Sequence, residues 1–133
     1  MSTDQIRRRV REKLREQRKL VEDLLREREQ LQGSLFERWA VCGKEGCACR
    51  EGRRHGPYYV LSTRSGGKGG FAYLEGSQAA EARELVKRHR AFRAEMRRLK
   101  RVGEQLVTLL RRYQEVLARQ GGHRVGISPH AGR

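Results

Sequence analysis

Proline, tryptophan and long apolar runs are scarce in this chain. With two Pro and one Trp among 133 residues, it has too little bulky apolar material to enclose a large globular core, so any core must be thin or shared. No run approaches the ~20 apolar residues that a membrane-spanning helix needs. The N-terminus, where Asp4 precedes Arg7, Arg8 and Arg9, lacks the apolar stretch of a signal peptide. These absences predict a one-domain, cytoplasmic protein without a membrane partner.

Negative charge is scarce as well. The chain has 16 Asp and Glu against 31 Lys and Arg, which gives a formal net charge of +15. An excess of this size attracts polyanions, and phosphodiester backbones come before anionic lipids or acidic proteins. Arg-rich helices can also be simply well solvated, but solvation does not account for the surplus over acidic residues. We therefore expect nucleic acid as the partner, DNA first, although the sequence does not separate DNA from RNA.

Two amphipathic patterns indicate long helices. Residues 1–32 form the first segment, which has no Gly or Pro before Gly33. Its apolar stripe is Ile6, Val10, Leu14, Val21, Leu24 and Leu31. The second segment, 77–120, starts at Ser77 as a candidate N-cap and carries a heptad seam. The seam is Leu85, His89, Phe92, Met96, Leu99, Gly103, Leu106, Leu110, Tyr113, Leu117 and Gln120, flanked by Val102, Leu109 and Val116.

Apolar stripes of this kind must pack against something. We expect either an antiparallel coiled-coil hairpin within one chain or a coiled coil between chains, and hence a homo-oligomer. The oligomer order cannot be read from the pattern. After the second helix, residues 121–133 have no periodicity and are expected to be a disordered tail.

The segment 33–76 between the helices is rich in Gly and has short alternating runs. Leu35–Val41, Pro57–Thr63 and Phe71–Leu74 predict a small three-stranded antiparallel β knob, so the fold class is mainly α with a β insertion. On the middle strand Tyr58 and Tyr59 face opposite sides, so we expect one ring in the core and the other exposed.

Three cysteines and one histidine lie within fourteen positions of the knob: Cys42, Cys47, Cys49 and His55. Three thiolates and one imidazole are an accepted ligand set for structural zinc. A Gly-rich segment this small buries too little apolar surface to offset the entropy lost on ordering. A bound zinc ion would supply the missing stabilisation. The spacing differs from the paired C-x-x-C of zinc ribbons. Small buried cysteines in a turn, or a redox-active thiol near Lys44 or Arg50, therefore remain alternatives.

Basic and aromatic residues form the expected nucleic-acid surface. On the second helix, the positions opposite the seam make an outward stripe suited to phosphate contacts. This stripe is Arg83, Lys87, Arg90, Arg97 and Arg101. The knob adds Arg38, Lys44, Arg50, Arg53, Arg54, Arg64 and Lys68, with Tyr58 as a ring that can stack on a base. A solvated helix face is the alternative for the stripe.

Part of the knob resembles the signature of a known family. The residues that carry the resemblance are Gly33-Ser34-Leu35, Cys42-Gly43-Lys44, Cys47-Ala48-Cys49, His55-Gly56-Pro57-Tyr58-Tyr59, Leu61-Ser62, Gly67-Lys68 and Tyr73. The family is small, bacterial and of unknown function, and its members often lie near transposase or recombinase genes. The resemblance covers the centre of the chain and, loosely, the second helix, but neither the first helix nor the tail. It implies a mobile-element setting without an established activity.

Two functions agree with these patterns. The first is a DNA-binding accessory protein whose Lys and Arg supply most of the affinity. The second is a coiled-coil adaptor that recruits a recombinase, a transposase or another partner. We do not expect an enzyme, because no His, Asp and Ser arrangement stands out and the glycines at 66–70 lack the Gly-Lys-Ser/Thr of a phosphate-binding loop.

Overall fold

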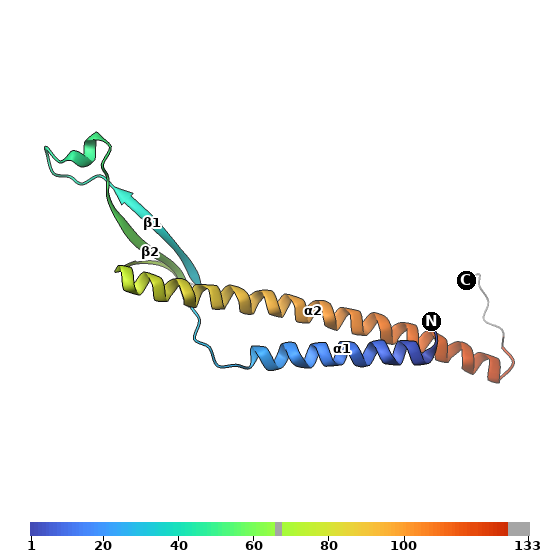
Figure 1. Ribbon diagram of the computed structural model, residues 1–133. Helices are drawn as coiled ribbons and strands as arrows, with labels where there is room; N and C mark the ends of the chain where they lie inside the picture. The colour runs from blue at the N-terminus through green and yellow to red at the C-terminus, as the bar shows by residue number, and fades with distance from the viewer. Residues whose placement is uncertain (66–67, 128–133) are drawn as a thin grey trace. The chain divides into compact units, whose positions relative to one another are not determined.

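The computed structural model describes residues 1–65 and 68–127, without the side chains of residues 64, 65 and 68 (Figure 1). In chain order the elements are α1 (Thr3–Leu24), β1 (Gly33–Ala40), the short 3-10 helix η1 (Ala48–Glu51), β2 (His55–Ser65), β3 (Lys68–Leu74) and α2 (Gly76–Arg124). The predicted mainly α fold with a three-stranded antiparallel sheet is confirmed. The chain divides into two compact units. A helical unit joins Met1–Glu27 to α2 from Ala94 onward, and a knob unit spans Arg28–Arg93.

The first helix begins where its capping residues dictate and ends earlier than predicted. Ser2 Oγ accepts a hydrogen bond of 3.2 Å from the Gln5 amide, and Gln5 Oε1 accepts one of 2.9 Å from the Ser2 amide, a reciprocal capping box. α1 ends at Leu24, so the predicted extension to residue 32 is wrong. Residues 26–30 have no apolar side chain, and a longer helix would bury nothing there.

In the helical unit, α1 packs against the second part of α2 over a thin core. Leu20, Val102 and Leu106 form the buried cluster. Glu16 pairs with Arg98 at 3.2 Å, whereas Arg9, earlier in α1, shares a groove with the later part of α2. The contacts therefore run in opposite order along the two helices, so the helices are antiparallel here.

The buried stripe of α2 differs from the predicted seam. Val102 and Leu109, predicted only to flank the seam, are 2% and 8% exposed, whereas the seam residues Leu110 and Leu117 are 49% and 43% exposed. The α2 sequence contains two overlapping stripes with alternating spacings of three and four. Contact with α1 selects the stripe that includes Val102 and Leu109, and the other stays accessible in the single chain.

Both ends of α2 differ from the prediction by a few residues. The helix begins at Gly76, so Ser77 lies in its first turn and does not cap it. It ends at Arg124, so the predicted tail 121–133 begins as helix, and the rest of that tail from residue 128 lies outside the described residues. Gly126, with φ +76°, is the left-handed residue that follows the helix end. Within the described part of the chain, no helix is long and apolar enough to cross a membrane.

The sheet of the knob unit has the order β1-β2-β3 with antiparallel pairing throughout. Its inner face carries the buried Leu61 beside the half-buried Leu35, Tyr59 and Leu74. The ring of Tyr59 lies next to Gly76 at the start of α2, and Figure 1 shows the sheet beside the first turns of that helix. In these turns Ala79, Ala82 and Val86 are buried. Small residues therefore line the side of α2 that is covered in this unit.

Candidate metal centre and basic aromatic surface

The pairing of β1 with β2 brings the first and last candidate ligands together. Ala40 pairs with His55 at the end of the ladder, so Cys42 starts its loop close to the histidine. Cys47 and Cys49 lie at the start of η1. The sulfur atoms of the three cysteines and a ring nitrogen of His55 all lie within 4.8 Å of one another.

Two glycines allow the loop to fold inward. Gly46 has φ +76° directly before Cys47, and Gly52 has φ +109° at the C-terminal end of η1. Both values lie in the left-handed region that glycine adopts without steric cost. The two glycines therefore give the backbone the turns that the cysteine loop requires.

The distances fit a shared metal ion. Cys42 Sγ and Cys49 Sγ are 3.4 Å apart, and Cys47 Sγ and His55 Nε2 are 3.2 Å apart. Around a tetrahedral zinc ion, sulfur and nitrogen ligands would be separated by about 3.6–3.8 Å, so small shifts would complete the tetrahedron. A disulfide requires sulfur atoms about 2 Å apart, and all three cysteines are free. The four residues could hold a metal ion.

The pKa values of Cys47 and Cys49 are shifted in opposite directions. The backbone N–H of Cys49, and then the side chains of Cys42, Cys49 and His55, lower the pKa of Cys47 to about 6. Burial raises the pKa of the Cys49 thiol, which is 2% exposed. Since the thiolate is the metal-binding form, Cys47 would enter a complex already ionised at neutral pH, whereas Cys49 would lose its proton on binding.

Simple burial does not account for all four residues. Only Cys49 is fully buried, while Cys42 and Cys47 are half-buried and His55 is exposed. The imidazole of His55 contacts the sulfur of Cys47. The convergence of four donors is the observation that favours metal binding over small cysteines packed in a turn.

The predicted cationic contacts are exposed wherever their side chains are described. They are Arg38, Lys44, Arg50, Arg53, Arg54, Arg83, Lys87, Arg90, Arg97 and Arg101. In the described part of the chain, ion pairs engage Lys13, Arg26 and Arg98, and none of the predicted contacts takes part. The side chains of Arg64 and Lys68 lie outside the described residues. The predicted stripe on α2 is divided between the two units after Arg90.

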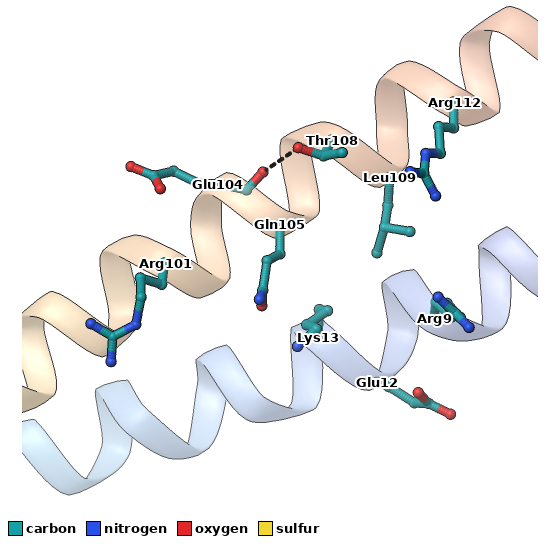
Figure 2. A pocket seen from close by; sticks show the side chains of 9 residues that line it. All are labelled: Arg9, Glu12, Lys13, Arg101, Glu104, Gln105, Thr108, Leu109 and Arg112. Atoms are coloured by element: carbon teal, nitrogen blue, oxygen red, sulfur yellow. Dashed lines mark hydrogen bonds between the residues drawn. The ribbon is translucent and has the colours of Figure 1, made fainter.

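Arg101 takes a different position from the rest of the stripe. Figure 2 shows it beside an open groove between α1 and α2. The groove is also lined by Arg9, Lys13, Arg112, Glu12, Glu104, Gln105, Thr108 and Leu109. Sequence reasoning missed the basic residues of this groove, because the pairing of α1 with α2 determines which of their many arginines converge. Arg101 is exposed and also borders this groove, so it does not lie wholly opposite the helix contact.

The outer face of the sheet carries a second feature that was only partly predicted. Tyr58 is exposed and Tyr59 half-buried, which confirms that the two rings have different environments. Phe36, Phe71 and Tyr73 are also exposed on the Tyr58 side, by the strand register. Alternation within each strand predicts which of its residues point to the same side. Which residues of different strands share a face becomes clear only when the register of the three strands is known.

Comparison with known proteins identifies one family. Residues 4–84 match the family model described as "Domain of unknown function (DUF6788)". The matched range includes α1, which the resemblance in the sequence did not cover, and extends through the knob into the first turns of α2. No curated protein and no solved structure matches the chain.

Proposed function

The chain belongs to the DUF6788 family, whose description names no function, and we propose that it is a nucleic-acid-binding protein with DNA as the first candidate ligand. The observation that carries the proposal is the set of exposed cations on the knob unit that no described carboxylate pairs with. A net charge of +15 on 133 residues leaves these cations to counterions in the free protein. Phosphates would replace the counterions and release them, which drives association.

The cations come from two kinds of backbone. Arg53 and Arg54 follow η1 in the loop that leads to His55, whereas Arg83, Lys87 and Arg90 lie on α2 within the same unit. Because one group lies on a helix and the other follows the loop that carries the proposed metal ligands, the positive charges are held at defined spacings. Such contacts position the protein on a phosphate backbone without reading the base sequence.

The metal centre has a structural role in this proposal, and zinc is the ion that its ligands suit best. Three sulfur ligands and one imidazole fill a tetrahedral zinc shell and leave no position for a substrate or a water. We therefore propose a binding protein and not an enzyme. A reducing compartment such as the cytoplasm would keep the thiols available for the metal.

A salt titration of duplex binding tests the nucleic-acid proposal. If six or more Lys and Arg neutralise phosphates, affinity measured by fluorescence anisotropy should fall by about 10³-fold or more between about 50 and 200 mM salt. The zinc-loaded full chain is the material to use. An affinity that is absent at low salt, or that does not respond to salt, contradicts the proposal.

A second candidate function rests on the apolar stripe of α2 that α1 leaves uncovered. Val107, Leu110 and Leu117 line a shallow apolar groove together with Tyr113. A helix from a second copy or from a recombinase-like partner could cover it, as in a coiled-coil adaptor. The proposed mobile-element setting would supply such a partner, and in this case the cations would serve solubility or an acidic surface.

A further inference from the structure

The outer face of the sheet is unusually aromatic for a surface that no part of the described chain covers. Phe36, Tyr58, Phe71 and Tyr73 are 44%, 46%, 74% and 64% exposed. Aromatic side chains bring more apolar area than any others, and a contiguous exposed group of them marks an interaction site more often than chance.

The strand register arranges the rings in rows. Phe36, Val60 and Tyr73 lie opposite one another across the three strands, and Phe71 stands two residues before Tyr73 on β3. Strand geometry separates Phe71 from Tyr73 by about 7 Å and Phe36 from Tyr73 by about 10 Å. These spacings leave room for a planar base next to each ring. Val60 is buried between its two aromatic neighbours, so Phe36 and Tyr73 also cover the sheet, whereas Phe71 stays largely free.

The charge of this face is positive. By the register its positions include Ser34, Phe36, Arg38, Tyr58, Val60, Ser62, Phe71 and Tyr73, and none of these is a carboxylate. The guanidinium of Arg38 donates a hydrogen bond of 3.0 Å to the Tyr73 hydroxyl, which holds the cation beside the rings. The face therefore offers stacking surfaces and a fixed positive charge together.

We propose that this face binds the unpaired bases of a single-stranded nucleic acid. The inference rests on the nucleic-acid binding proposed above and deepens it by naming the form of the ligand. In a duplex the bases are stacked on one another, and only phosphates and base edges are accessible. Exposed aromatic rings therefore find no free base face to stack on. Unstacked bases stack on aromatic side chains while cations hold the backbone. The absence of acidic groups among the positions named for this face and the placement of Arg38 favour this polyanion over a protein partner.

The test compares a short mixed-sequence DNA strand with its duplex, by anisotropy, for variants of Phe71. Phe71→Ala should bind the single strand roughly 5- to 140-fold more weakly than the unmodified protein, which is the effect of losing one stacked base. Duplex affinity should change less than twofold. Phe71→Tyr keeps an aromatic ring and should bind the strand normally, whereas Phe71→Leu keeps only apolar bulk and should behave like Phe71→Ala. Leu25→Ala, a change of a similarly exposed apolar side chain in the helical unit, is the matched control.

Each other outcome has a distinct meaning. If Phe71→Ala leaves single-strand affinity unchanged while the duplex still binds, the stacking inference is wrong and the proposed function stands. If Phe71→Leu binds like the unmodified protein, or if the Phe71 variants change the oligomeric mass instead of the affinity, the face packs against protein and the inference is overturned. If neither nucleic acid binds at low salt, the proposed function itself fails.

Discussion

Arg38 and Tyr73 are joined by a hydrogen bond of 3.0 Å that reaches from β1 to β3 over the middle strand. Arginine on a strand normally extends into solvent and loses conformational entropy when it binds. Here the Tyr73 hydroxyl accepts a hydrogen bond from the Arg38 guanidinium, so the Arg38 side chain has already lost part of this entropy in the free protein. The bond thereby links the aromatic and the cationic parts of the outer face.

Removing this hydrogen bond while keeping the Tyr73 ring should cost the protein little stability. We expect Tyr73→Phe to change the free energy of unfolding by no more than about 1 kcal/mol, because the bond is exposed. Tyr73→Ala should lose more stability, since the ring also covers Val60. Urea unfolding of both variants measures the difference, and equal losses would show that the ring contributes no packing.

Zinc binding can be tested by native mass spectrometry before and after chelation. We expect one zinc per chain, and we expect the knob to be less stable but still folded, seen by thermal unfolding and proteolysis, when the metal is removed. His55→Ala should weaken zinc by more than the 10- to 100-fold typical of changes to residues that only support a metal ligand. The matched control is His123→Ala in the last turn of α2, which should bind zinc normally. A metal-free protein of unchanged stability would contradict the metal centre.

The metal-free protein should contain a thiol, that of Cys47, which ionises well below pH 9. The pKa of Cys47 is lowered to about 6 from an ordinary value of 9.0, mainly by the Cys49 amide. Because the folded pKa lies below the unfolded one, the stabilisation from Cys47 is fully present above pH 9, declines as the pH falls from 9 to 6, and is gone below 6. Thiolate absorbance and thermal unfolding measured across this range check both statements. A first ionisation near pH 9 would contradict them.

Two matched triple variants can distinguish the effect of the α2 cations on duplex binding from the effect of the protein's total charge. Changing Arg83, Lys87 and Arg90 to Glu should lower duplex affinity and reduce the magnitude of the salt slope by about 0.9 for each phosphate that is no longer neutralised. The control changes Arg8, Arg11 and Arg15 of α1 to Glu, with the same net charge and similar helical spacing. Equal decreases in affinity for the two proteins would mean that overall charge, and not the α2 cations, drives binding.

The uncovered stripe of α2 predicts self-association that does not depend on nucleic acid. Changing Leu110 and Leu117 to Glu should convert oligomers to monomers in sedimentation experiments, because two carboxylates would have to be buried in the contact. Both side chains are exposed in the single chain, so helix content should be retained. Leu106→Ala, in the buried cluster, should instead lower the free energy of unfolding by about 2–5 kcal/mol. A protein that is monomeric before mutation rules out this interface.

Much of the candidate site could be predicted from the sequence, because its residues are close along the chain. Cys42, Cys47, Cys49 and His55 lie within one loop, and their chemistry and spacing already suggested a common ion. The loop needs only two left-handed glycines and the pairing of β1 with β2 to bring the four donors together. Fold class, strand number and the different environments of Tyr58 and Tyr59 follow from local periodicity in the same way.

Other features depended on contacts between distant segments, and there the prediction was incomplete or wrong. The end of α1 at Leu24 and the choice of Val102 over Leu110 for burial depend on which residues find a partner across the helical unit. The outer aromatic face depends on the register between three strands, which alternation within each strand does not specify. Composition and local period by themselves determined the charge, the candidate ligand set and the type of each main element of this protein. Only the tertiary structure decided which faces are covered, because burial is a property of pairs of segments and not of either one alone.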